Sequence, residues 1–242
     1  MNRLTRNIAC LILGLALGGF TALAFAGIND HCPQFTVNGA PVYQAESGDQ
    51  EICHLNYAVI HRCSVKAPVA VFEHLTPAAM SGPAKRRDDF RPDPQVTPEC
   101  RAQLSDYAGN PYDRGHMAPA ANNTQTVEIM SESFFLSNMV PQVPNNNRGI
   151  WKQLETWERA WAATPGTDFY IISGGIYTPQ RQVIGNGVGV PDYLFKVIIE
   201  KNSRKVHAYL MPNAALPVAD LPKYEVPLQT VEQYTGMRFN LQ

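Results

Sequence analysis

The sequence has no excess of charge of either sign. Its 242 residues include 20 Lys and Arg against 21 Asp and Glu, and two of the arginines fall in the first 26 residues, leaving 18 basic residues against 21 acidic ones. This balance excludes a protein that binds polyanions through bulk positive charge. Any contact with a nucleic acid would need a local basic group, for which Lys85, Arg86, Arg87 and Arg91 are candidates.

Long apolar runs are missing apart from one at the N-terminus. A positively charged start precedes apolar and small residues over 8–20, and Ala24 and Ala26 occupy the two positions that a signal peptidase reads. We expect a secretory signal over residues 1–26, cleaved after Ala26, because the run is short for a membrane span. The alternative is a retained N-terminal anchor. We expect residues 27–242 to form a single domain, secreted or periplasmic and free of the membrane.

Closely spaced cysteines are also missing. No two of Cys32, Cys53, Cys63 and Cys100 are two to four residues apart, the spacing of a structural zinc site. The fifth cysteine, Cys10, lies in the segment expected to be removed, so four remain. An even number of cysteines in an exported protein indicates two disulfides, and four cysteines allow three pairings. We favour Cys32–Cys53 with Cys63–Cys100. A His-Glu-x-x-His helix and carboxylate clusters are absent too, which disfavours a zinc protease or another metal hydrolase acting on small substrates.

Short runs of β-branched and aromatic residues predict strands. These runs cover residues 56–60, 67–72, 169–173, 193–199 and 206–211. The first two are expected to pair. Together with the helices described next, they predict an α+β fold with a central antiparallel sheet flanked by helices.

Helical spacing is clearest over residues 149–163, where apolar residues at Ile150, Trp151 and Leu154 alternate with charges and Pro165 follows the end. A last helix is expected at 231–234.

Other segments lack a regular period. Residues 27–50 are expected to wrap the surface, and residues 76–112 are rich in Pro, Asp and Arg and predict a long loop of functional type. Residues 131–138 are expected to form a strand or a short turn. We find no internal repeat and no linker that would divide the chain.

Residues 113–120 read Asp-Arg-Gly-His-Met-Ala-Pro-Ala. The His116 imidazole can take a proton from water near neutral pH, as a general base must. Gly115 allows the backbone to approach a substrate, and Arg114 can pair with phosphate through its planar guanidinium. The alternative for His116 is a hydrogen-bonded histidine buried in a turn.

Two further residues lie around the predicted helix. Asn147 offers a neutral amide oxygen, a ligand that suits Mg²⁺, although a turn asparagine is the alternative and composition cannot distinguish it from Asn145 and Asn146. Glu155 would lie about two turns into the helix, with Arg159 four residues later. The alternative for this Glu and Arg is an exposed ion pair.

Together these segments resemble the DNA/RNA non-specific endonuclease family, the ββα-metal or His-Me finger nucleases that include mitochondrial endonuclease G. The first signature of the family is matched closely by residues 113–120. The second is matched by residues 137–142, Asn147, 149–151 and 154–155. Weaker likeness runs from Tyr57 to Gly236, so the resemblance covers nearly all of the mature chain.

The resemblance implies a role for each candidate. His116 would be the general base, Asn147 the single direct metal ligand, and Glu155 the holder of metal-bound water. Asn138 would fix the histidine loop, and Arg114 and Arg159 would contact phosphate. An upstream arginine usually assists, for which we select Arg87 over Arg86 and Arg91. Phe134 stands where some members have a polar residue, so no role is transferred to it.

The implied activity is Mg²⁺-dependent hydrolysis of phosphodiester bonds in DNA and RNA, with 5′-phosphate products and Mn²⁺ as an alternative ion. A homodimer is compatible with the resemblance. The alternative is a secreted protein that binds nucleic acid or another partner on a nuclease scaffold, without turnover.

Overall fold

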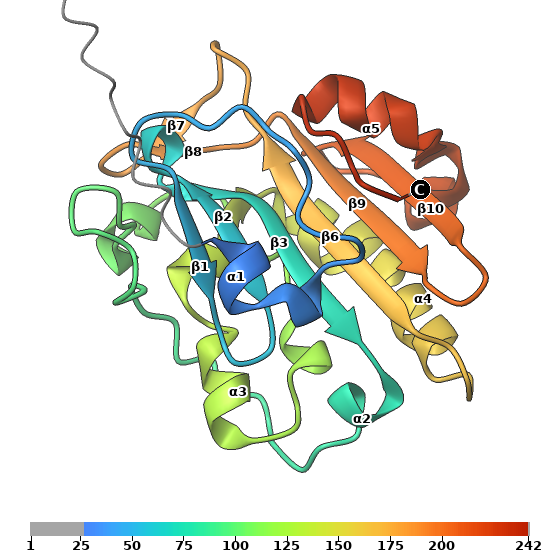
Figure 1. Cartoon of the computed structure of the whole chain (residues 1–242). Helices are drawn as coiled ribbons and strands as arrows, with labels where there is room; N and C mark the ends of the chain where they lie inside the picture. Colours follow the sequence, from blue (N-terminus) through green and yellow to red (C-terminus); the bar gives the residue numbers. More distant parts are fainter. Residues whose placement is uncertain (1–26, 242) are drawn as a thin grey trace, which may run out of the picture.

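The computed structural model describes residues 27–241 (Figure 1). The predicted signal segment, residues 1–26, lies outside the described residues. Within the described part, no helix is both long and apolar enough to cross a membrane.

A seven-stranded sheet forms the centre of the molecule, and every neighbouring pair of its strands is antiparallel. In spatial order the strands are β1 (Gln50–Cys53), β2 (Ala58–Arg62), β3 (Ala67–Leu75), β6 (Phe169–Ile176), β9 (Tyr193–Glu200), β10 (Lys205–Pro212) and β11 (Glu225–Val226). This confirms the predicted α+β class with a central antiparallel sheet.

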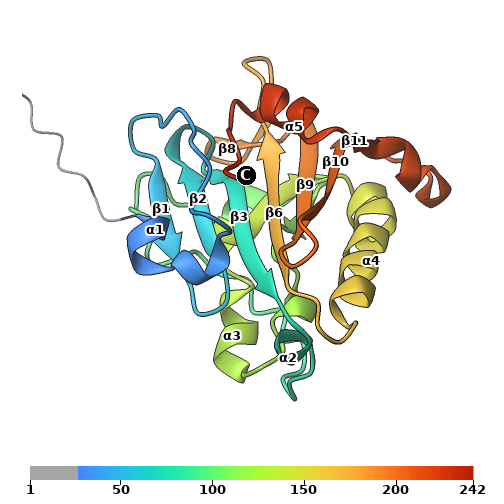
Figure 2. The same ribbon diagram turned by 45° about the vertical axis from the view of Figure 1, so that its right-hand side comes forward.

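Helices and short helical turns surround this sheet. The helices are α1 (Ile28–His31), α2 (Pro77–Met80), α3 (Val127–Glu132), α4 (Lys152–Ala162) and α5 (Leu228–Thr235). The 3-10 turns are η1 (Pro33–Phe35), η2 (Cys63–Val65), η3 (Leu104–Tyr107), η4 (Ala120–Asn122), η5 (Leu136–Asn138) and η7 (Val218–Tyr224). The views in Figures 1 and 2 place α1 and α4 on opposite sides of the sheet.

Side chains alternate between the two faces of the sheet, so each face has its own apolar core. In β2, Val59 packs on the side of α4 with Trp151 and Leu154, whereas Ile60 packs on the other side with Ile28 and the C-terminal tail. The amphipathic spacing of α4 explains this docking, because Leu154 and Trp151 share the face that is buried against the sheet.

A second, two-stranded sheet lies on the α4 side. It pairs β4 (Asp113–His116) with β5 (Met139–Gln142), and a further small pair joins β7 (Val183–Ile184) to β8 (Val188–Gly189). A π-helical turn, η6 (Asn146–Trp151), follows β5 and runs directly into α4. The order strand, strand, helix places the histidine motif, the asparagine cluster and Glu155 on consecutive packed elements.

Four of the five predicted strands lie inside observed strands, and the fifth, at 56–60, begins two residues before β2. The predicted helix at 149–163 corresponds to the end of η6 and to α4. The last predicted helix lies within α5. The prediction for residues 131–138 was wrong where it allowed a strand, because the segment holds the end of α3 and the turn η5. Thr126 caps the start of α3 by accepting a hydrogen bond from the Ile129 backbone N–H. The prediction followed Phe134 and Phe135 and missed this capping residue.

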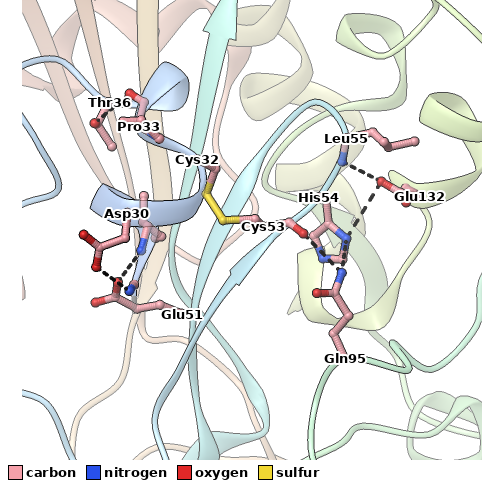
Figure 3. Close-up of a disulfide and its surroundings, with 12 residues drawn as sticks. Asp30, Cys32, Pro33, Thr36, Glu51, Cys53, His54, Leu55, Gln95 and Glu132 are labelled. Carbon is pink, nitrogen blue, oxygen red and sulfur yellow. Dashed lines mark hydrogen bonds and ion pairs between the residues drawn. A yellow bond between two sulfur atoms is a disulfide. The ribbon is translucent and has the colours of Figure 1, made fainter. Parts of the chain in front are cut away.

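Residues 27–50 do wrap the sheet, but they are not only a polar surface layer. Ile28 and Phe35 are buried in the core on that side. Disulfides Cys32–Cys53 and Cys63–Cys100 are both present, which confirms the favoured pairing. Figure 3 shows the first of them joining the end of α1 to β1, so the N-terminal layer is covalently attached to the edge of the sheet.

Candidate active site

His116 is the last residue of β4, where it pairs with Met139 of β5. Gly115 precedes it and pairs with Val140, while the Gln142 side chain lies against the glycine. A Cβ at Gly115 would overlap the side-chain amide of Gln142. The buried Gln142 side chain therefore approaches the strand too closely for any residue larger than glycine. The φ angle of Gly115 is not in the left-handed region, so space and not backbone conformation requires the glycine.

Asn138 holds the loop that follows His116. Its side chain is fully buried and exchanges two hydrogen bonds with the backbone of Ala118, each of 2.8 Å, while its amide nitrogen also donates to the Ser133 carbonyl. The Asn138 carbonyl accepts from the Met117 N–H as well. An amide that satisfies buried backbone groups on two segments fixes both of them, which supports the predicted positioning role.

The His116 ring lies among aromatic side chains, and no carboxylate of residues 27–241 pairs with it. Phe134 and Phe90 meet it edge to face, with ring centroids 5.0 and 5.6 Å away. Burial, together with the positive charges of Arg86 and Arg114, lowers the pKa of His116 from 6.5 to about 3. The imidazole is therefore neutral at physiological pH and can accept a proton.

The start of the helix is joined to β4 at two points. Asn147 donates from its amide nitrogen to Asp113 Oδ2 at 2.8 Å, and Arg148 pairs with the same carboxylate. Further along, Trp151 Nε1 donates to the His116 carbonyl at 3.3 Å. These bonds hold the asparagine turn beside the strand that carries His116.

Asn147 fits a hard cation by the chemistry of its side chain. Its amide nitrogen is turned toward Asp113, and a carboxamide that donates on one side presents its oxygen on the other. Neighbouring Asn146 is buried, and its side-chain oxygen already accepts a hydrogen bond of 2.9 Å from Gln142 Nε2. The structure therefore favours Asn147 over Asn146 as the ligand. One oxygen ligand from the protein, with water molecules as the remaining ligands, suits Mg²⁺.

Glu155 lies on α4, two turns beyond the asparagine turn, and is partly buried. Burial raises the pKa of Glu155 to about 7, Glu158 adds to the shift, and Lys196 and Arg159 oppose it. Its charge therefore depends on pH in the neutral range. Arg159 does not form the simple exposed ion pair considered as an alternative, because its guanidinium donates to the buried Asn122 at 3.3 Å.

The arginines are not equally placed. Arg114 lies over the Phe90 ring, 4.1 Å from its centroid, and Arg86 lies over Phe134 at 5.0 Å, so both flank aromatic rings that touch His116. Arg87, the upstream arginine selected from the sequence, instead lies near the exposed Glu128. The structure therefore favours Arg86 over Arg87 as the assisting upstream residue, a register difference of one position.

One polar cluster escaped the sequence prediction. Glu73, Asn122, Glu158 and Lys196 are all nearly or fully buried around α4. The signal that could have revealed them is a charged residue inside an apolar strand, as for Glu73 and Lys196. For Glu158, the signal is its position four residues after the core residue Leu154 on the same helical face.

A β4–β5 pair followed by a helix, with a neutral histidine on the first strand and an amide at the start of the helix, defines a ββα-metal nuclease. The family comparison agrees, since residues 36–242 match the model of the DNA/RNA non-specific endonuclease family. The chain belongs to this family and is a nuclease, and members of the family generally use a divalent metal ion.

Named relatives extend this comparison. Human mitochondrial nuclease EXOG is 31% identical over 96% of this chain and 71% of its own length. Human mitochondrial endonuclease G is 34% identical over 76% of this chain and 67% of its own length. The crystal structure of the EndoG/EndoGI complex superimposes with a TM-score of 0.75 at 31% identity, covering 85% of this chain and 89% of that chain.

Proposed function

We propose that this nuclease is a Mg²⁺-dependent endonuclease that hydrolyses phosphodiester bonds in both DNA and RNA and leaves 5′-phosphate ends. The observation that carries the proposal is the neutral, carboxylate-free His116 on a strand bonded to the turn that presents Asn147. A protein that only bound nucleic acid would gain nothing from keeping an imidazole uncharged beside an anionic ligand.

Each residue of the site has a defined task in this reaction. His116 accepts the proton of the attacking water, because its neutral ring is available throughout the physiological pH range. Arg114, Arg159 and Arg86 supply positive charge to the phosphate. The Asn147 oxygen would hold Mg²⁺, with Mn²⁺ as a substitute, and the Glu155 carboxylate would orient water bound to it. When bound, the ion offsets charge that builds on the phosphate and the leaving oxygen.

Low sequence preference follows from the kind of contact. Guanidinium groups recognise the phosphate, and phosphate contacts carry no direct base information. The aromatic side chains at the site, Phe90 and Phe134, pack against His116 and against Arg114 and Arg86. We therefore expect cleavage of DNA and RNA alike, with activity that falls as salt rises. A homodimer remains part of the proposal.

We also propose that the chain is exported, by cleavage after Ala26, to the periplasm or the cell exterior. Two disulfides within residues 32–100 support an oxidising compartment. N-terminal sequencing of the protein recovered from its native host tests this, because a mature chain beginning at Gly27 is expected and an intact residue 1 in the folded protein would contradict it.

The activity is tested by incubating the purified protein with supercoiled plasmid and with single-stranded RNA, in Mg²⁺ and in EDTA. Cleavage of both polymers in Mg²⁺, none in EDTA, and 5′-phosphate product ends are expected. A gel-shift measurement on the same samples identifies the alternative, because binding without cleavage in Mg²⁺ would indicate a scaffold that has lost turnover.

A further inference from the structure

A buried polar cluster connects the sheet to helix α4. Its members, Glu73 of β3, Asn122 of η4, Glu158 of α4 and Lys196 of β9, are each at most 2% exposed. Lys196 Nζ lies 2.9 Å from Glu158 Oε2. Buried charges persist only when they are paired and hydrogen-bonded, so this cluster fixes the relative positions of the four elements that contribute to it.

Asn122 uses both ends of its side chain within the cluster. Its amide nitrogen donates to Glu158 Oε1 at 3.1 Å and to Glu73 Oε1 at 3.2 Å. Its amide oxygen accepts a hydrogen bond of 3.3 Å from Arg159 Nη1. Asn122 also follows His116 by six residues in the same segment of chain, so it joins the histidine segment to the helix that carries Glu155 and Arg159.

The chemistry requires an amide at this position. Burial and the nearby Glu158 carboxylate raise the pKa of Glu73 well above its usual range, which favours the protonated form of Glu73, while Lys196 pairs with Glu158. Between two carboxyl groups and one guanidinium, the central side chain must donate twice and accept once. A carboxamide does both, whereas a carboxylate would only accept and a hydroxyl would be too short.

We propose that Asn122 is a positioning residue of the nuclease, which fixes the Arg159 guanidinium relative to the segment that carries His116 and acts on the phosphate through Arg159. Asn122 cannot touch the nucleic acid itself, since it is fully buried. The inference rests on the proposed function, in which Arg159 contacts phosphate. Small displacements of such groups can slow a reaction a hundredfold, because the reacting atoms must be held within a narrow range of positions.

The test is a kinetic cycle with Asn122→Ala, Arg159→Ala and the double variant, using a fluorescently labelled DNA duplex in Mg²⁺. Asn122→Ala is expected to lower kcat/KM about 10- to 100-fold. The double variant is expected to be no slower than Arg159→Ala alone, since both changes remove the same contact. Independent losses that multiply in the double variant would overturn the proposal.

Asn123→Ala is the matched control. Asn123 is the next residue and is equally buried, but its side chain donates to a backbone carbonyl, that of Pro119 at 3.0 Å. Its side chain bonds to Pro119 and Asn56 and does not contact Arg159. A comparable fall in melting temperature with kcat/KM within about threefold of the wild type is expected. A loss of activity equal to that of Asn122→Ala would indicate a merely structural role for both residues and contradict the proposal.

Salt dependence supplies a second readout that a structural role would not change. Loss of one phosphate contact should reduce the slope of log kcat/KM against log salt concentration by about one. Arg159→Ala and Asn122→Ala are expected to share this reduction, and an unchanged slope in a folded Asn122→Ala protein would refute the inference. If Asn122→Ala does not fold, Asn122→Ser takes its place, because its hydroxyl can still donate to one carboxylate but cannot reach Arg159.

These outcomes are distinguishable from a failure of the proposed function itself. If the wild-type protein does not cleave the duplex in Mg²⁺, the proposed endonuclease activity is wrong. If the wild type cleaves and Arg159→Ala cleaves equally fast, the activity stands and the role of Asn122 is refuted.

Discussion

Replacing Glu155 by Gln is expected to stabilise the metal-free protein at alkaline pH while slowing cleavage. Burial raises the pKa of Glu155 from 4.5 to about 7, with Glu158 adding to the shift. The folded state therefore holds this proton more tightly than the unfolded chain does. The stability that the group contributes is present below pH 4.5 and is lost as the pH rises through about 7.

The size of the effect follows from the displacement of the pKa. At about 1.4 kcal/mol per pKa unit, the full shift corresponds to about 3 kcal/mol. Since Glu155 is partly exposed and solvent screens it, about half of this is expected, or ~1.5 kcal/mol. For a domain of this size, the change corresponds to a rise in Tm of about 3 to 6 °C.

Urea unfolding in EDTA measures this directly at pH 5 and at pH 8.5. The excess of Glu155→Gln over the wild type should be small near pH 5, where the folded wild-type carboxyl is still protonated, and much larger at pH 8.5. Glu99→Gln, a change at an exposed carboxylate, is the control and should show no such difference. A Glu155→Gln protein that is equally or less stable than the wild type at pH 8.5 would refute the reasoning.

Three further predictions concern the rest of the molecule. Arg86→Ala should slow duplex cleavage about tenfold or more and Arg87→Ala less than about threefold, because Arg86 lies beside Phe134 at the histidine; steady-state rates measure this, and the reverse order would contradict it. Replacing Cys63 and Cys100 by Ala should lower the free energy of unfolding in urea by about 3 to 4 kcal/mol for a separation of 37 residues, and a loss below about 1 kcal/mol would argue against the entropic account. The pKa of His116 is lowered to about 3, so below pH 6.5 the unfolded chain binds a proton that the folded protein does not. The free energy of unfolding should therefore fall as the pH drops from 6.5 toward 3. His116→Ala should make that fall shallower, and an unchanged pH slope would refute the assignment.

Much of the fold was predictable because local patterns and packing agree. The β-branched runs at 67–72 and 193–199 lie in central strands, where both faces are covered, and α4 shows the helical spacing that its docking requires. The turn at η6 was not predictable, because a π-helical start depends on bonds from Asn147 and Arg148 to Asp113, more than thirty residues away.

The site was predictable to the extent that its chemistry lies in short motifs. Residues 113–120 identify His116, but they do not reveal that burial keeps its ring neutral, since that depends on Phe134 and Phe90 from other segments. The distinction between Asn146 and Asn147 required their hydrogen bonds to Gln142 and Asp113. The sequence did not distinguish Arg86 from Arg87, because an irregular loop has no period from which a register can be read.

The sequence pattern could mark members of the charged cluster around Asn122 as buried, but it could not show which of them pair. From residue type alone, every Glu and Lys is expected to be exposed to solvent. Only tertiary packing brings Glu158 and Lys196 together in the interior. Sequence periodicity could mark these positions as facing inward, yet the pairing that makes their burial tolerable is a property of the assembled fold.

The measurement that tests the account most directly is the single-turnover rate of plasmid nicking by His116→Ala in saturating Mg²⁺. His207→Ala, at a histidine that pairs with Glu225 away from the catalytic strand, is the control. Loss of the base should slow the reaction about 10²- to 10⁴-fold in a protein that melts as cooperatively as the wild type, while the control keeps its rate. Nicking by folded His116→Ala at the wild-type rate would contradict the account.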